Sequence, residues 1–480
     1  GSCCFLVVWL AFTIPALGVS VTGTDWIVHF NLPDQLSTWN TGSADEYCLR
    51  AAMLDHINAL QTNHSAWLAT YTFSGSNYLA GGAAGPIISA LDAALNRGAR
   101  VFFVVGKEVE TDFMFNGTNS LDTLAARSKN PLVLVQDDSS SGIHHNKIGV
   151  FDYGSSNRWV FVASWNFTAA ASSSQWNIGL EVKNNADLFT AYTNEFAELL
   201  AGHFHDHPEK RHTHDGTRFR LSDSWGDGWV RFSPYPDESY WGTNAMTDIV
   251  NGISNAEREI VFSLNILSKP SHPLICDALV EAANRGVMMQ GVIPMSGWNT
   301  TNATSYAAYI FLTNTLSYAT TNIVHFVIPY KKADYSVLDD GLATDLVHTK
   351  YMIIDAWAAN PVVIHGSANW TESALLYDDS NDENILFLRH RGIARAFHAQ
   401  FKRMTGIWTN RDDFWCDMKS VSNNTVVGLW VTDTNEYALE RSVDLSSWMA
   451  CASGVSNRVG RTVYETNVSE RIGFYRLRRE

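Results

Sequence analysis

The chain has 480 residues, a formal net charge of −15, 46% hydrophobic residues and 12% aromatic residues. This composition is typical of folded globular domains and excludes a disordered protein, and the length suffices for two or three domains with sizeable cores. The acidic balance argues against a protein that binds nucleic acids non-specifically through a broad basic surface.

The first predicted element is an apolar segment, Cys3–Gly18, which ends in the small-x-small sequence Ala-Leu-Gly at 16–18. Such a segment is typical of a signal-peptide core and is too short for a dependable membrane span. We therefore expect residues 1–18 to be a truncated signal peptide and the protein to be secreted, either extracellular or periplasmic. Among the later cysteines, Cys416 and Cys451 could form a disulfide in an oxidising compartment.

Helix-like and strand-like segments follow, and their order occurs twice. In both halves a helix ends in the tripeptide Asn-Arg-Gly, where Gly98 and Gly286 are natural C-caps. The alternation predicts an α/β fold with an α/β/α sandwich in each of two lobes. Because the order of elements is repeated, we expect the lobes to face each other across a pseudo-twofold axis, with a crevice between them. The predicted segments are 48–60, 67–73, a helix ending at 98, 100–105, 246–253, 259–264, 281–286 and 287–293.

These segments suggest five parts of the chain. After the leader we expect a first lobe, a polar linker, a second lobe and a compact β-rich module without a catalytic constellation. The main role expected of this module is to stabilise the rest of the protein rather than to bind a surface or a glycan. The expected ranges are 19–202, 203–222, 223–410 and 411–480.

The linker contains five histidines between His203 and His214. Imidazole is a common metal ligand. The spacing nevertheless matches no established site, and a polar linker explains the histidines equally well, so we expect no metal here.

The sequence carries one motif twice in the same register. Each copy reads His-x-Lys-x-x-x-x-Asp and is followed by Ser-x-Asn, and the second copy lies 348 − 145 = 203 residues after the first at every one of these positions. Agreement of so many functional residues indicates an internal duplication that kept its chemistry. The two sets are His145, Lys147, Asp152, Ser164 and Asn166, and His348, Lys350, Asp355, Ser367 and Asn369.

The residue types fit the cleavage of a phosphodiester. Each His and Lys lies on an alternating apolar segment that reads as a β-strand, where residues i and i+2 share a face. Lys and Asn donors suit the phosphate oxygens and the charge they gain in the transition state. One neutral His can attack phosphorus while the other, protonated, gives a proton to the leaving oxygen.

These motifs resemble the signature of the phospholipase D superfamily, and the chain looks like a secreted bacterial-type member. The second copy, Gly366-Ser-Ala-Asn369, matches the superfamily pattern fully, whereas the first has Ala163 in place of the usual Gly. The resemblance implies that Glu181 and Glu383 each brace the His of the opposite copy.

The resemblance also implies roles for the other residues. His145 is expected to attack phosphorus, and His348 to protonate the leaving alcohol and then activate water, although the reverse assignment stays open. Asp152 and Asp355 are expected to be structural, as is His144. The residues expected to bind the phosphate are Lys147, Lys350, Asn166, Asn369, Ser164 and Ser367.

The sequence leaves more than one substrate class open. Export and 17 Trp favour hydrolysis of phospholipids at a membrane surface, with transfer to other alcohols as a further reaction. The segments Gly366–Thr371 and Asn381–Asn384 are also similar to the nuclease branch, so DNA or RNA is the alternative substrate. A non-catalytic secreted binding protein is the remaining hypothesis. We expect a monomer that needs no cofactor.

Overall fold

The structure is a computed structural model. It has two compact units, residues 1–401 and 402–480, which are described separately. It describes 18–31, 48–75, 83–154, 156–173, 175–205, 207–235, 243–268, 274–294, 325–330, 346–376 and 381–405, together with the backbone of strands between 415 and 479. The proposed signal peptide before Gly18 and the side chains of Cys416 and Cys451 lie outside these residues.

The first lobe is built on an eight-stranded mixed sheet in the order β1-β2-β9-β7-β6-β3-β4-β5. Its central strands are apolar and β-branched or aromatic, as in the sequence RVFFVV of β4, which suits a sheet covered on both faces. The strands are β1 (Gly18–Thr22), β2 (Trp26–Asn31), β3 (Ser65–Thr70), β4 (Arg100–Val105), β5 (Val133–Gln136), β6 (Ile148–Asp152), β7 (Arg158–Ala163) and β9 (Ile178–Lys183).

The second lobe has an eight-stranded sheet in the order β10-β11-β18-β17-β16-β12-β13-β14. Taken in turn, each strand has a counterpart at the same place in the first sheet, so the duplication predicted from the motifs is present in the topology. The strands are β10 (Arg218–Phe219), β11 (Gly228–Ser233), β12 (Glu259–Leu264), β13 (Met288–Pro294), β14 (His325–Tyr330), β16 (Lys350–Ile354), β17 (Val362–Gly366) and β18 (Glu383–Leu388).

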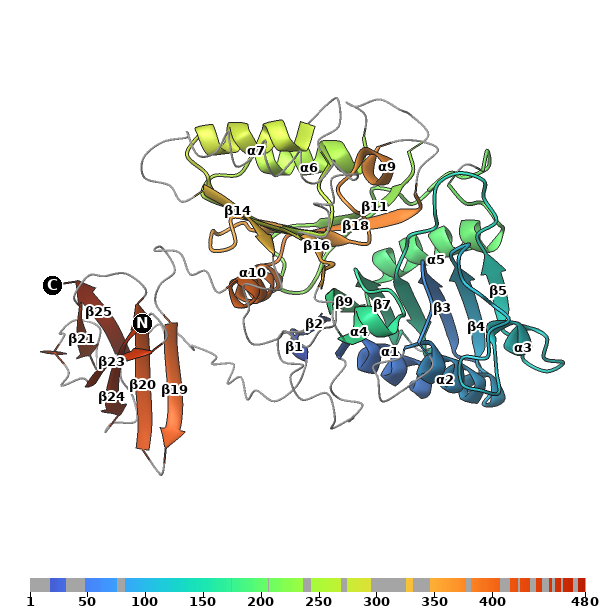
Figure 1. The fold of residues 1–480 in the computed structure, drawn as a ribbon, viewed down its shortest axis with the longest axis horizontal. Coiled ribbons are helices and arrows are strands. Elements are labelled where there is room, and N and C mark those ends of the chain that lie inside the picture. The colour runs from blue at the N-terminus through green and yellow to red at the C-terminus, as the bar shows by residue number, and fades with distance from the viewer. Residues whose placement is uncertain are drawn as a thin grey trace. The chain divides into compact units, whose positions relative to one another are not determined.

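Helices cover both sheets (Figure 1). In each lobe two longer helices lie on the outer face, α1 and α2 on the first sheet and α6 and α7 on the second. The helices are α1 (Cys48–Ala59), α2 (Ala84–Asn96), α3 (Leu121–Ala125), α4 (Ala169–Ser173), α5 (Ala186–Leu200), α6 (Ala245–Ser254), α7 (Leu274–Asn284), α9 (Glu372–Leu375) and α10 (Arg391–Thr405).

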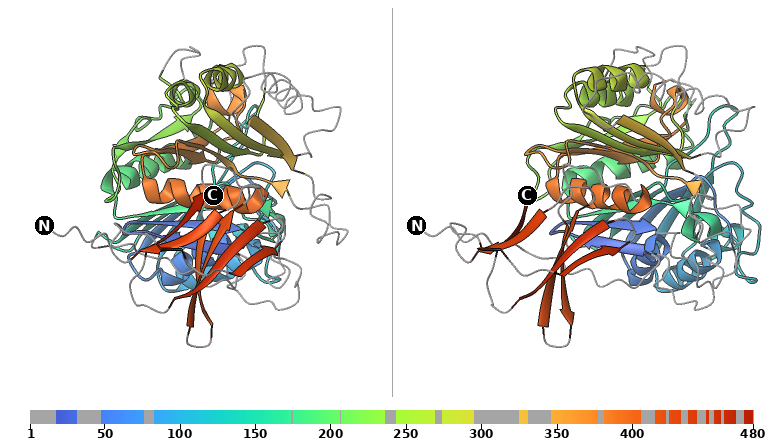
Figure 2. Two further views of the ribbon diagram at one scale, coloured as in Figure 1. Left: turned by 90° about the vertical axis from the view of Figure 1, so that its left-hand side faces the viewer. Right: turned by 60° about the vertical axis from the view of Figure 1, so that its left-hand side comes forward.

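Two helices, α5 and α10, lie between the two sheets (Figure 2). Phe397 of α10 packs edge-on against Phe30 of β2, with ring centroids 5.7 Å apart, and against Tyr351 of β16, 5.2 Å away. Tyr192 of α5 packs in the same way against Phe232 of β11. These buried aromatic contacts hold the lobes together, since large apolar surfaces leave water where they meet.

The two Asn-Arg-Gly tripeptides end α2 and α7. Gly98 and Gly286 have φ of +91° and +93°, a left-handed conformation that glycine adopts without steric cost. The arginines before them donate to carbonyl groups near the end of the preceding helix, Arg97 to Leu60 and Arg285 to Ile253. The C-caps predicted from the sequence are confirmed, and each also anchors one helix to another.

The two-lobed α/β fold predicted from the sequence is confirmed. The second sheet begins at β10, so it starts inside the segment expected to be a linker. None of the described helices is long and apolar enough to cross a lipid bilayer.

The second unit, 402–480, contains antiparallel strands in a four-stranded sheet, β19-β20-β24-β23, and a three-stranded sheet, β22-β21-β25. Its strands are β19 (Trp415–Val421), β20 (Asn424–Val431), β21 (Tyr437–Ser442), β22 (Met449–Ala450), β23 (Gly454–Arg458), β24 (Arg461–Val468) and β25 (Phe474–Arg479).

Candidate active site

The two motif histidines are brought together by contacts that cross between the lobes. The backbone N–H of His145 donates to the carbonyl of Asp382 in the second lobe, at 3.0 Å. In the reciprocal contact, the N–H of His348 donates to the carbonyl of Trp176 in the first lobe, also at 3.0 Å. Two short strands support this second crossing, β8 (Gln175–Trp176) and β15 (Leu346–Val347), which pair in parallel. Each lobe therefore positions the histidine of the other.

The histidines do not lie inside strands. β6 begins at Ile148 and β16 at Lys350, so His145 and His348 occupy the extended segments just before them. Both side chains are at least nine-tenths buried. The prediction of a strand starting at the histidine was therefore wrong by two or three residues, while the backbone is extended enough to keep His and Lys together.

His145 is held by a carboxylate. Its Nδ1 lies 2.6 Å from Oε1 of Glu383, and the hydroxyl of Ser367 donates to the other carboxylate oxygen, also at 2.6 Å. Burial raises the pKa of Glu383 to about 7, against the attraction of Lys147. Burial lowers the pKa of His145 well below its usual range, and the ammonium groups of Lys147 and Lys350 add to the effect. A neutral His145 that donates Nδ1–H to Glu383 keeps the lone pair of Nε2 for reaction.

His348 is held by an amide instead. Its Nδ1 lies 3.0 Å from Oδ1 of Asn177, which also accepts from the hydroxyl of Ser164 at 2.8 Å. The amide nitrogen of Asn177 donates to the carbonyl of Ala171, which fixes the side-chain orientation. Burial, followed by the charge of Lys350, lowers the pKa of His348 well below its usual range. Among the residues that the structure describes, none of the contacts of the His348 ring is to a carboxylate, so the protonated imidazole gives up its proton more readily than one paired with a carboxylate.

The role predicted for Glu181 is wrong. Its carboxylate lies 3.1 Å from Nε2 of His29 and 3.4 Å from Nε2 of His56, and not against a motif histidine. The residue that faces His348 is Asn177, directly before β9, as Glu383 is the first residue of β18. Asn177 and Glu383 correspond through the strand pairing, because each precedes the residue whose carbonyl accepts the N–H of the motif serine, Ile178 for Ser164 and Asn384 for Ser367.

The side chains of the motif lysines are buried, and each contacts the histidine of its own copy. Lys147 donates to the carbonyl of His145 at 2.6 Å, and Lys350 donates to that of His348 at 2.8 Å. Lys350 also lies 3.3 Å from Nε2 of His348, so it can return a proton there. Burial lowers the pKa of Lys147 to about 7 and that of Lys350 well below its usual range. Desolvated ammonium groups of this kind gain from a bound phosphate, whose negative charge compensates theirs.

The motif asparagines differ in their present contacts. The side-chain oxygen of Asn166 is buried and has no hydrogen-bond partner among the described residues. That of Asn369 accepts from Asn265 at 3.3 Å. The binding of phosphate by both amides stays a prediction.

The two motif serines do not point their protons at a phosphate, contrary to the prediction. Each hydroxyl donates its single proton to the group that holds a histidine, Ser164 to Asn177 and Ser367 to Glu383. Each also accepts a backbone N–H, from Ile178 and from Asn384. The serines therefore position the residues behind the histidines.

The structural role expected for the motif aspartates agrees with their contacts. Asp355 accepts three backbone N–H groups, from Glu257, Arg258 and Glu259, and so ties the end of β16 to the start of β12. Asp152 accepts the N–H of Gly154 at 2.8 Å. His144 is fully buried, and burial lowers its pKa to about 4, which suits a neutral structural residue.

Sequence reasoning missed Tyr71, which follows β3. Its ring centroid lies 5.2 Å from that of His145, and Nζ of Lys147 lies 5.6 Å from the centroid of the same ring. At the corresponding place after β12 stands Asn265, which contacts Asn369. Tyr71 and Asn265 each directly follow the strand that pairs with the motif strand of their lobe. This shared position is the signal in the sequence that could have indicated them.

The family model described as "Cardiolipin synthase, PLD-like domain" matches the chain twice, over 53–200 and 249–405, once for each lobe. No curated protein sequence matches the chain.

Solved structures resemble the chain at low sequence identity. A phosphatidylserine synthase from Haemophilus influenzae Rd KW20 is 10% identical, with 74% of this chain and 83% of the synthase covered and a TM-score of 0.48. A polyphosphate kinase from Porphyromonas gingivalis is 13% identical, with 79% and 50% covered and a TM-score of 0.45, so this chain spans half of the kinase. Yeast tyrosyl-DNA phosphodiesterase is 12% identical, with 73% and 87% covered and a TM-score of 0.44.

The family model covers both lobes and more than half of the chain, and the motif residues of both copies meet at one buried site. The chain therefore belongs to the phospholipase D superfamily, with one PLD-like domain in each lobe.

Proposed function

We propose that this protein hydrolyses phospholipid phosphodiesters through a phosphohistidine intermediate on His145. The observation that carries the proposal is the 2.6 Å contact between Nδ1 of His145 and the Glu383 carboxylate, paired with a second histidine held by an amide. One imidazole is thereby prepared as a nucleophile and the other as an acid.

In the first step Nε2 of His145 attacks phosphorus and the bond from phosphorus to the leaving oxygen breaks. The negative charge of the bound phosphate favours the protonated form of His348, which gives its Nε2 proton to that oxygen, and the oxygen departs as an alcohol. The Glu383 carboxylate stabilises the positive charge that develops on the phosphorylated imidazole, in the way that a carboxylate supports a catalytic histidine elsewhere. Lys147 and Lys350 stabilise the extra charge on the phosphate oxygens.

In the second step His348, now neutral, takes a proton from water. The resulting nucleophile attacks phosphorus, the P–N bond to His145 breaks, and a phosphomonoester leaves. An alcohol in place of water would give a new diester, which is the transfer reaction expected of such an intermediate. Acid and base roles thus alternate on His348 alone.

The asymmetry of the site supports this order of roles over the reverse. An imidazolium beside a carboxylate is a weak acid, because the ion pair favours the charged form. An imidazolium beside the Asn177 amide lacks that pairing and gives up its proton more readily. His145 is therefore the better nucleophile, and His348 the better acid.

Two features favour a lipid as substrate. The net charge of −15 does not favour a polyanion. The loop that leaves β4 at Gly106, directly beside Tyr71, carries two exposed apolar side chains, Phe113 and Met114. Exposed apolar side chains of this kind can contact a membrane surface. Secretion and action as a monomer are further parts of this proposal.

One observation favours nucleic acid as the second candidate. The half-buried ring of Tyr71 lies beside His145 and offers a flat surface on which a base next to the scissile phosphate can stack. A lipid gains less from such a ring.

The test uses the purified full chain in EDTA with phosphatidylcholine vesicles, single-stranded DNA and bis(p-nitrophenyl) phosphate in parallel, and the variant His145→Ala as the blank. Choline release with intact DNA supports the phospholipase, and formation of phosphatidylethanol when ethanol is added supports the intermediate. DNA cleavage without lipid turnover overturns the substrate class and keeps the mechanism. No turnover of any diester overturns the activity itself.

A further inference from the structure

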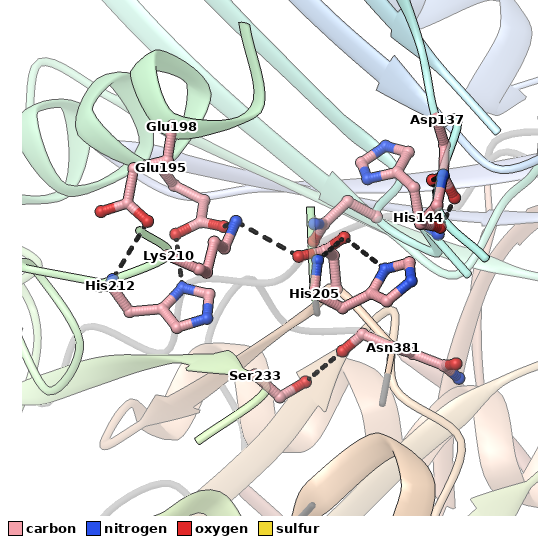
Figure 3. Close-up of polar contacts among 12 residues, drawn as sticks. Asp137, His144, Glu195, Glu198, His205, Lys210, His212, Ser233 and Asn381 are labelled. Carbon is pink, nitrogen blue, oxygen red and sulfur yellow. Dashed lines mark hydrogen bonds and ion pairs between the residues drawn. The ribbon is translucent and has the colours of Figure 1, made fainter. Parts of the chain in front are cut away.

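The histidine-rich segment between the lobes, His203–Asp215, does not behave as a solvated linker. Among its described residues, His205, Lys210 and His212 are buried, with 2%, 7% and 6% of their surfaces exposed. They take part in a continuous set of ion pairs that runs from α5 to the residue before Glu383 (Figure 3).

Along this set, basic side chains and carboxylates alternate. The Glu195 carboxylate of α5 accepts from Nδ1 of His212 at 2.8 Å and from Nζ of Lys210 at 2.7 Å. Lys210 also lies 3.2 Å from the carboxylate of Asp382. The other oxygen of Asp382 lies 3.1 Å from Nδ1 of His205. Every member is buried, so each charge depends on its neighbours for compensation.

His205 stands at the end of this set with both ring nitrogens facing acceptors. Nδ1 faces the Asp382 carboxylate, and Nε2 faces the carbonyl oxygen of Ser141. A neutral imidazole carries one proton, so it would set a lone pair against one of the two oxygens. Only the imidazolium donates to both.

Both acceptors belong to segments whose backbone places His145. Asp382 accepts the N–H of His145 at its carbonyl and donates its own N–H to Ile143 at 3.1 Å. Ser141 lies in the loop that follows β5 and leads into these residues. Asp137 begins that loop and accepts the N–H of His144 at 2.9 Å. His205 thus ties the middle of the loop 137–145 to the residue that precedes Glu383.

We infer that His205 is a positioning residue for the reaction, whose imidazolium fixes the loop 137–145 against Asp382 and so makes turnover depend on its protonation. The inference rests on the phosphodiesterase activity proposed above. It differs from that activity in predicting which group outside the site governs the pH dependence.

The groups around His205 favour its charged form. Asp382 and Asp137 are acidic and lie on the two segments that it joins, whereas Lys210 and neutral His144 are the basic groups beside Asp382. Burial alone lowers the pKa of His205, but the hydrogen bond and charge of Asp382, together with the Ser141 carbonyl and the charge of Asp137, outweigh burial and raise it above the ordinary 6.5. The imidazolium is therefore present below that pH, and its contacts are lost as the pH rises through the raised value.

The kinetic test compares His205→Phe with the matched variant His203→Phe in full pH profiles of kcat and KM on bis(p-nitrophenyl) phosphate. His203 is in the same segment but pairs with the exposed Glu209, so it reports a ring substitution outside the buried set. We expect His205→Phe to lose about tenfold in kcat at acid pH, with KM nearly unchanged, and to lack one alkaline step of the wild-type profile. His203→Phe should keep the wild-type profile. A wild-type profile in His205→Phe overturns the inference.

A second measurement does not need a folded variant or any activity. Amide hydrogen exchange of the wild-type peptide covering 138–145, corrected for the intrinsic pH dependence of exchange, should speed up as the pH rises through the His205 transition, while a peptide from β13 does not. Unchanged protection across that range overturns the inference. Loss of protection together with absent diester turnover would support the tie and reject the proposed function, so the two failures are distinguishable.

Discussion

The two halves of the site share a backbone arrangement and differ in chemistry. His145 and His348 both donate their backbone N–H to the opposite lobe, and both turn Nδ1 toward the residue that follows the accepting carbonyl. That residue is Glu383 for His145 and Asn177 for His348. Duplication has preserved the geometry while one carboxylate became an amide, or the reverse.

The difference extends to the residues that accept the backbone N–H. Asp382, behind His145, is fully buried and belongs to a set of ion pairs with Lys210 and His205. Trp176, behind His348, is equally buried and apolar. The residue that accepts the N–H of His145 is therefore fixed by ion pairs, whereas the residue that accepts the N–H of His348 is a buried apolar side chain. A pair of imidazoles needs different pKa values to act as nucleophile and acid, and different surroundings are the means of separating them.

The largest expected effect comes from removing either imidazole. His145→Ala and His348→Ala should each lower kcat by about 10³-fold or more, because each step needs one nucleophile and one proton donor. The measurement that separates the halves is a rapid acid quench with a ³²P-labelled diester. Labelled protein should be absent in His145→Ala and should accumulate in His348→Ala when the leaving group is p-nitrophenolate. Label in His145→Ala would reverse the assignment.

Replacing the carboxylate of the first half is the next largest change. Glu383→Gln keeps the size of the side chain but removes the charge that supports a phosphorylated His145, so we expect kcat to fall by about 10²-fold. Because burial raises the pKa of Glu383 to about 7, wild-type activity should also fall as the pH drops below that value, and the variant should lack this acid limb. An unchanged acid limb in Glu383→Gln would assign it to another group.

The converse substitution gives the second half the carboxylate of the first. Asn177→Asp places a carboxylate against Nδ1 of His348, which raises the pKa of that imidazole and makes it a weaker acid. We expect kcat to fall about tenfold for a diester with an alkyl leaving group and much less for one with p-nitrophenolate, which needs no proton. An equal loss for both leaving groups would place the role of Asn177 elsewhere than in the acid step.

The sequence predicted the features that the two lobes share better than the features in which they differ. Two sets of His, Lys, Ser and Asn in one register indicated the lobes and the site, because identical residues at a fixed spacing are visible without a structure. Asn177 was missed since the intervals differ: it follows Ser164 by 13 residues, whereas Glu383 follows Ser367 by 16. A search for a carboxylate also cannot find an amide at the equivalent position, so the sequence pointed to Glu181 instead of Asn177.

The linker was misjudged for another physical reason. A segment with many histidines, acids and Lys210 reads as solvent-exposed, since such residues are rarely buried unpaired. Its partners are Glu195 and Asp382, and the second lies more than 170 residues away in the chain. Pairing between residues so far apart leaves no local pattern, so only the fold reveals that this polar segment is buried.

The buried ion pairs around Asp382 should be more sensitive to the loss of one cation than a partly exposed ion pair elsewhere in the chain. Lys210→Met leaves the buried Glu195 and Asp382 without their shared partner, so we expect the free energy of unfolding to fall by about 3–5 kcal/mol. The control is Arg127→Ala, which removes a partly exposed ion pair with Asp92 and should cost no more than about 1 kcal/mol. Urea unfolding of both variants measures the two losses. Equal losses would mean that the buried ion pairs of Lys210 stabilise the fold no more than a partly exposed ion pair does.

The smallest effect on turnover is expected for a substitution of Glu181. This substitution tests whether the amide of Asn177 or the carboxylate of Glu181 positions His348. Glu181→Gln should leave kcat within about twofold of the wild type, because Glu181 contacts His29 and His56 instead of the site. It should still lower the free energy of unfolding by about 1–3 kcal/mol, as a buried charged hydrogen bond is lost.

The pH dependence of that loss identifies its origin. Burial alone would raise the pKa of Glu181, yet the hydrogen bonds from His29 and His56 lower it to about 2. Its stabilisation is therefore fully present above the ordinary value of 4.5 and disappears as the pH falls toward 2. Wild type and variant should differ in urea unfolding at pH 7 and converge in acid. A large loss of kcat with no such convergence would return Glu181 to the catalytic site and remove the asymmetry on which the two roles depend.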